Sequence, residues 1–118
     1  MLKAISPLDG RYHERTAPLG DYFSEFALMG ARIWVELQYL LALDGTGVFP
    51  PLNQRERKKI EKMAQSFSAE DYAAIKLLET ELNHDVKSCE IYLQETLGLR
   101  HPNRIHFGLT SEDVNNIA

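Results

Sequence analysis

Three short polar segments contain the residue types that could bind a charged ligand. Gly10-Arg11-Tyr12 follows a turn, Asn83-His84-Asp85 interrupts a helical pattern, and Thr110-Ser111 precedes another one. An arginine held by a turn can bind phosphate or carboxylate through two parallel hydrogen bonds. Imidazole and hydroxyl groups beside the free N–H groups of a helix start also suit an anion. The segments together predict an anion site, while each alone also fits an ordinary turn or helix cap.

Helical patterns surround these segments. Residues 24–44 carry one apolar stripe at three- and four-residue steps, which Trp34 and Tyr39 widen, so we expect much of this helix to be buried. The stripe consists of Phe26, Met29, Ile33, Leu37, Leu40 and Leu41. Ser24 is the expected N-cap, and the glycines and prolines of residues 45–51 end the helix.

Further start signals predict the remaining helices. Asn53 with Glu56 forms a capping-box pattern for a helix to about residue 66, and Ser68 starts another. The second pattern is interrupted near residues 80–84, and we favour two helices over one kinked helix. Asn83 is then the expected N-cap of the later helix, with Asp85 in its first turn.

The ends of the chain differ from its middle. Residues 1–23 contain Ser6-Pro7-Leu8-Asp9-Gly10 and predict an irregular arm that faces a ligand. Residues 111–118 begin an apolar helical stripe that has only started at Ala118, so we expect a fragment cut within a helix. No run alternates with the period of a strand, which predicts an all-α fold in a single domain of 118 residues.

Composition narrows the classes of function. A hydrophobic share of 44% and a charged share of 25% are typical of a globular protein. The net charge of -4 disfavours nucleic acid as a partner, and the basic cluster of residues 55–59 is interleaved with acids, as on a solvated face. We find no secretory signal and no apolar run long enough to span a membrane, and expect a cytoplasmic protein without a membrane partner. Cys89 lies on an apolar helical face and should be a buried residue rather than a nucleophile.

A metal site is the least favoured alternative. Its ligands would be the histidines His13, His84, His101 and His106. No two of them have the three- or four-residue spacing of a helical metal pair, so we expect no metal.

The polar segments, in their order and spacing, resemble the N-terminal region of the adenylosuccinate lyase family within the fumarase/aspartase superfamily. The Ser6-Pro7-Leu8-Asp9-Gly10-Arg11-Tyr12 arm, Asn83-His84-Asp85, and Thr110-Ser111-Glu112-Asp113 before Asn115-Asn116 carry the resemblance. Phe23-Ser24-Glu25 adds to it, and the resemblance covers essentially all 118 residues. It implies an all-helical N-terminal domain, truncated before a long central helical bundle.

The resemblance also implies an activity. This family eliminates fumarate from adenylosuccinate, giving AMP, and from the succinyl-carboxamide ribotide of purine biosynthesis. It needs no metal or organic cofactor, and its active sites form where three subunits of a homotetramer meet.

The resemblance implies these substrate-binding residues: Arg11, Tyr12, Asn83, His84, Asp85, Thr110 and Ser111. Arg11 and Tyr12 would contact the nucleotide phosphate. Thr110 and Ser111 would hold a carboxylate of the succinyl group. His84 would hydrogen-bond the substrate in an auxiliary catalytic role.

The principal catalytic groups of the family have no counterpart in this chain. Its base is a serine on a mobile loop and its acid is a histidine, both beyond the equivalent of residue 118. We therefore expect the isolated chain to be inactive and the longer parent to be the enzyme. Two alternatives remain: a helical interaction module without catalysis, and another lyase of the superfamily.

Overall fold

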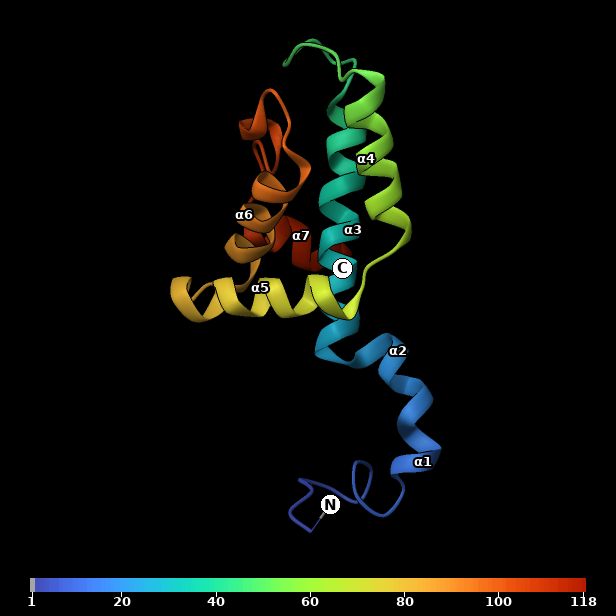
Figure 1. The fold of residues 1–118 in the computed structure, drawn as a ribbon. Coiled ribbons are helices and arrows are strands. Elements are labelled where there is room, and N and C mark those ends of the chain that lie inside the picture. The colour runs from blue at the N-terminus through green and yellow to red at the C-terminus, as the bar shows by residue number, and fades with distance from the viewer. Residues whose placement is uncertain (1) are drawn as a thin grey trace.

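In the computed structural model, which describes residues 2–118, the chain folds around its longest helix, α3 (Glu25–Leu43) (Figure 1). The hydroxyl of Ser24 accepts the N–H of Ala27 at 3.1 Å and starts the helix, as the sequence predicts. Met29, Ile33 and Leu37 are buried along one face, so the apolar stripe forms the centre of the core.

Four further helices pack around α3. They are α4 (Gln54–Gln65), α5 (Ala69–Leu82), α6 (Asp85–Leu97) and the short α7 (Ser111–Ile117). In Figure 1, α4 runs beside α3, α5 crosses below, and α7 lies between α3 and α6, while α6 contacts α3, α4 and α5. The predicted capping box at Asn53, the helix start at Ser68 and the break before α6 are confirmed. Within residues 2–118 there is no strand, so the predicted all-α fold is confirmed.

Two apolar clusters hold the helices together. The larger joins α3, α4, α5 and α6 with the loop before α4 and the chain after α6, and consists of Met29, Ile33, Leu37, Leu40, Leu52, Ile60, Ile75, Cys89, Leu93, Leu97, Leu99 and Ile105. The smaller contains Val35 of α3, Val86 of α6 and Val114 of α7, with Leu109 packed against it. Because Val86 and Val114 lie in the first turns of their helices, the smaller cluster fixes the starts of α6 and α7 against α3.

Trp34 does not widen the buried stripe. Its side chain is 50% exposed and Phe26 is 41% exposed, so the expectation that both belong to the core is wrong. The buried face of α3 runs instead through Arg32 and Glu36, which are both buried although they are charged.

The N-terminal arm extends away from the other helices (Figure 1). The predicted irregular structure ends at Tyr12. Residues 13–23 form the short helices α1 (His13–Thr16), η1 (Ala17–Leu19) and α2 (Gly20–Phe23), which the sequence interpretation missed. Pro18 lies in the first turn of η1, where its missing N–H costs no hydrogen bond, so it does not prevent these turns.

One helical stretch, His13–Leu43, is long and apolar enough to cross a membrane. The sequence analysis expected no such stretch, and by the criteria of length and composition that expectation is wrong. The core helix of a soluble protein meets the same two criteria, and α3 is the core helix here. The extended backbone of Ser24 also interrupts this stretch. The stretch therefore gives only weak support for a membrane protein.

Candidate functional site

The Asn83-His84-Asp85 segment forms the junction between α5 and α6. Asn83 ends α5 in the left-handed conformation, with φ 54°, and donates its N–H to the carbonyl of Glu79 at 2.8 Å. The predicted N-cap role of Asn83 is therefore wrong. Asparagine adopts the left-handed conformation more readily than most residues, which suits it to a helix end.

His84 is the N-cap of α6. Its Nδ1 accepts the backbone N–H of Lys87 at 3.0 Å, and its side chain is 51% exposed. A ring nitrogen that accepts a hydrogen bond carries no proton, so the cap requires neutral imidazole with the proton on Nε2. Nε2 is then a donor that is available to a ligand at the surface.

Asp85 occupies the first turn of α6, as predicted. Its Oδ1 accepts the N–H of Val86 at 2.8 Å, and its Oδ2 lies 3.0 Å from Nη2 of Arg32. Partial burial alone would raise the pKa of this carboxyl group. The Val86 N–H and the positive charge of Arg32 outweigh that effect and lower the pKa below its usual 3.8.

Thr110 and Ser111 begin α7. The N–H and the hydroxyl of Thr110 both donate to Oδ2 of Asp113, at 2.8 and 3.0 Å. Ser111 is half-buried, and no residue of the described chain hydrogen-bonds its hydroxyl. Of the two hydroxyls, that of Ser111 is therefore the one available to a ligand.

Arg32 connects these two segments. Its Nη2 contacts Asp85 at the start of α6, while its Nε donates to Oδ1 of Asn115 in α7 at 2.9 Å. Asn115 lies one helical turn after Ser111. The structure therefore brings the His84 and Ser111 segments to one side of α3 through a shared side chain.

The Arg11-Tyr12 segment lies elsewhere, on the arm. Both side chains are exposed, and the guanidinium of Arg11 lies 6.0 Å from the centre of the Tyr12 ring. A shallow pocket of about 330 Å³ is lined by residues 10–15 alone. A separate pocket of about 400 Å³ is lined by Asn83, His84 and Asp85 with three residues of α5. Within residues 2–118, the arm and the His84 segment therefore do not form a single pocket.

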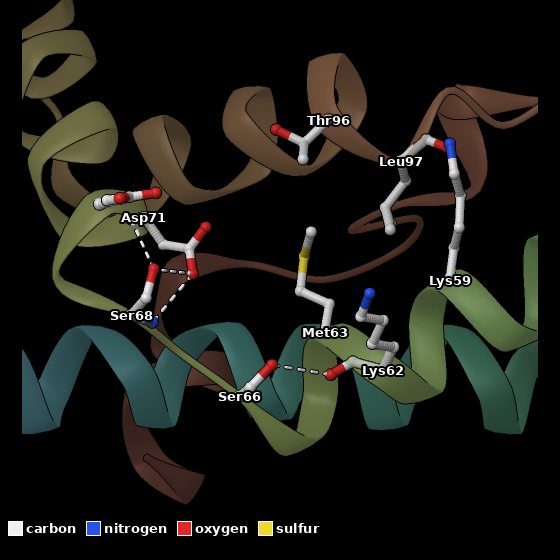
Figure 2. A pocket seen from close by; sticks show the side chains of 9 residues that line it. Lys59, Lys62, Met63, Ser66, Ser68, Asp71, Thr96 and Leu97 are labelled. Atoms are coloured by element: carbon white, nitrogen blue, oxygen red, sulfur yellow. Dashed lines mark hydrogen bonds between the residues drawn. The ribbon is translucent and has the colours of Figure 1, made fainter.

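Figure 2 shows a third pocket, of about 530 Å³, between α4, α5 and α6. None of the predicted site residues lines it. Its main polar groups already have protein partners, since Lys59 donates to the carbonyl of Leu97 at 3.3 Å and Asp71 accepts from Ser68 and Tyr92. This pocket is explained by the packing of three helices.

Two buried charged residues of α3 were missed by the sequence interpretation. Arg32 and Glu36 are 9% and 1% exposed. Glu36 contacts Nδ1 of His106, which adopts a left-handed backbone conformation with φ 62°. The burial of these two residues could have been predicted from their spacing, because both lie on the stripe that contains Met29, Ile33 and Leu37. A charged residue at such a position needs a partner from another element.

Among residues 2–118, no group of three or more histidine, cysteine or acidic residues could hold a metal ion. Cys89 is fully buried, as predicted, and burial raises the pKa of its thiol to about 12. A buried thiol with this pKa is not a nucleophile.

Comparison with known proteins gives one consistent result. The chain is 41% identical over 125 residues to the adenylosuccinate lyase of Legionella pneumophila (strain Philadelphia 1). It is 39% identical over 127 residues to that of Dictyostelium discoideum and 38% identical over 125 residues to that of Haemophilus influenzae. Each match covers 99% of this chain and 27% of the relative. No family model matches the chain. The chain is thus similar to adenylosuccinate lyases over 99% of its length, and it spans about a quarter of the length of those relatives.

Proposed function

We propose that this chain supplies substrate-binding residues to the active site of an adenylosuccinate lyase. In the proposed reaction, a base removes a proton from the succinyl carbon next to a carboxylate. The carbon–nitrogen bond then breaks, and the departing nitrogen takes up a proton to give AMP and fumarate. The observation that carries the proposal is the 41% identity to a named adenylosuccinate lyase over 99% of the chain.

The geometry of the α6 and α7 starts supports this proposal. The substrate carries a phosphate and two carboxylates, and loss of the carbon-bound proton adds negative charge to one carboxylate. Fixed hydrogen-bond donors aimed at developing charge stabilise such a transition state strongly. The Nε2–H of His84 and the hydroxyl of Ser111 are donors of this kind, on helices whose starts are anchored to α3. Asn83, Asp85 and Thr110 line the same region in the proposal.

His84 acts in this account as a neutral donor. Its Nδ1 is occupied by the N–H of Lys87, so a proton could be added there only by breaking the cap of α6. We therefore assign His84 to orientation and stabilisation of the substrate. The principal acid and base come from other parts of the enzyme, and the isolated chain is inactive.

Arg11 and Tyr12 serve a site formed with another copy of the protein. They lie on an arm whose pocket shares no residue with that of His84, which favours an assembly in which the arm reaches a neighbour. The arm also exposes large apolar side chains, with Ile5 96%, Tyr22 77% and Phe23 83% exposed. Surfaces of this kind are covered in an assembly. We propose a cytoplasmic homotetramer without a metal or organic cofactor.

The experiment uses a chimera in which these 118 residues replace the matching segment of the Legionella pneumophila enzyme. Loss of adenylosuccinate is followed for the chimera and for its His84→Ala, Ser111→Ala and Arg11→Ala variants. Each variant should lower kcat/KM at least tenfold, because each removes a donor to the charged substrate. His101→Ala and Lys58→Ala are the matched controls, since both residues lie outside the proposed site, and they should keep the activity of the chimera. Equal activity of all five variants would refute the assignment.

A further inference from the structure

Arg32 stands out as a nearly buried charged side chain that contacts two separate helices. It lies in the middle of α3 and is 9% exposed. Its two partners, Asp85 and Asn115, are 30 residues apart in the sequence and belong to α6 and α7. We propose that Arg32 is a positioning residue that sets the distance between the His84 and Ser111 segments. This inference rests on the function proposed above.

The two contacts use different nitrogens of the guanidinium group. Nη2 lies 3.0 Å from Oδ2 of Asp85, and Nε lies 2.9 Å from Oδ1 of Asn115. The planar guanidinium group has five N–H donors in fixed directions, so it can hold two acceptors at a defined angle. The ammonium group of lysine is a point charge on a flexible stem and does not define that angle.

Both partners lie close in the chain to a candidate ligand donor. Asp85 directly follows His84, whose ring caps α6. Asn115 follows Ser111 by one turn of α7, and Val114 beside it is fully buried against Val35 and Val86. A change in the position of the Arg32 head group therefore moves the two donors relative to each other.

Packing alone does not explain why an arginine occupies position 32. Burying an arginine costs desolvation energy, whereas an apolar side chain at the same place on α3 would extend the surrounding cluster without that cost. The ion pair with Asp85 is only partly buried, since 48% of the Asp85 side chain is exposed, so it stabilises the fold modestly. What Arg32 provides beyond an apolar residue is a directed link between α6 and α7.

Arg104 is the matched control. It is also a buried arginine, 0% exposed, and it donates to the carbonyl of Pro50 at 2.9 Å near Asp44. Its contacts lie in the loop between α3 and α4, away from His84 and Ser111. Arg104→Lys therefore removes a comparable buried guanidinium without changing the proposed link.

The first test measures backbone amide chemical shifts of the 118-residue chain. Asn115→Ala is the key variant, because it removes one acceptor from α7 and leaves Arg32 paired with Asp85. It should shift the amides of residues 84–87 in α6, and Arg32→Lys should shift both those and the amides of residues 110–113. Arg104→Lys should shift neither set. Unchanged amides of residues 84–87 in the Asn115→Ala variant would overturn the inference.

The second test measures activity in the Legionella chimera. Arg32→Lys should lower kcat/KM at least tenfold, because displacements of about 1 Å at a site reduce rates on that scale. Arg104→Lys should keep the rate of the chimera at a temperature where both variants are folded. An Arg32→Lys variant as active as the chimera would contradict the positioning role. An unsubstituted chimera without activity would contradict the proposed function instead, and the amide shifts would still decide whether Arg32 links the two segments.

Discussion

The buried carboxylate of Glu36 is bonded to Nδ1 of His106, 70 residues later in the chain. The second oxygen of Glu36, Oε2, has no hydrogen-bond partner among the described residues. Burial raises the pKa of Glu36 above its usual 4.5, although the hydrogen bond and charge of His106 act in the opposite direction. The pair holds the loop before Thr110 against α3. On that helix, Glu36 lies four residues after Arg32.

Substitution of Glu36 by glutamine should change how stability depends on pH. A carboxyl group whose pKa is raised by folding stabilises the fold fully below its unfolded pKa, and this contribution is lost as the pH rises through the folded pKa. Wild-type stability should therefore fall relative to Glu36→Gln as the pH rises above about 4.5. His106 and the nearby Glu90 are present in both proteins. Urea unfolding at several pH values between 4 and 8 measures the difference, and a difference independent of pH would contradict the account.

Substitution of Asp85 by asparagine should have the opposite pH dependence. The folded pKa of Asp85 is lowered, so its stabilisation is present above pH 3.8 and is lost as the pH falls below that value. Because the side chain is about half exposed, we expect a cost of about 1 kcal/mol at pH 7. The cost should shrink below pH 3.8. Denaturant titrations of both proteins at pH 7 and pH 3 test this, and a larger cost at pH 3 would be inconsistent with the ion pair.

The thiol of Cys89 should be unreactive in the folded chain. It is fully buried and its pKa is raised to about 12, so almost no thiolate is present at pH 8. Reaction with a disulfide reagent should be at least about a hundredfold slower in the native chain than in urea, because it requires local or global opening. Equal rates in the two conditions would show that α6 is not packed as described.

The cap formed by His84 can be tested separately from its proposed role at the active site. His84→Ala removes the acceptor for the N–H of Lys87 and should cost about 1 kcal/mol of stability. His84→Asn supplies a new acceptor and should restore most of that stability. Only the imidazole also places an Nε2–H donor at the surface, so both variants should impair the chimera. Recovery of full activity by His84→Asn would assign His84 to capping alone.

Local sequence signals predicted most of the fold. Ser24, Asn53 and Ser68 begin helices as expected, since their side chains supply acceptors for the first N–H groups. The junction near Asn83 was located correctly, but Asn83 was predicted as the N-cap of the later helix, a role that His84 fills. Histidine is not among the preferred capping residues, so His84 gave no such signal.

The tertiary partners could not be predicted in the same way. The pairs of Arg32 with Asp85 and Glu36 with His106 join residues more than 50 positions apart, and no local pattern encodes them. The sequence predicted which residues could bind an anion, whereas their arrangement required the packing of α6 and α7 on α3.

The most direct test of the central claim compares two samples under the same conditions. One is the isolated 118-residue chain, and the other is the chimera that carries it in place of the matching Legionella segment. Loss of adenylosuccinate and release of fumarate are measured for both. We predict no turnover by the isolated chain and turnover by the chimera that depends on His84 and Ser111. A folded, assembled chimera without turnover, or turnover by the isolated chain, would contradict the account.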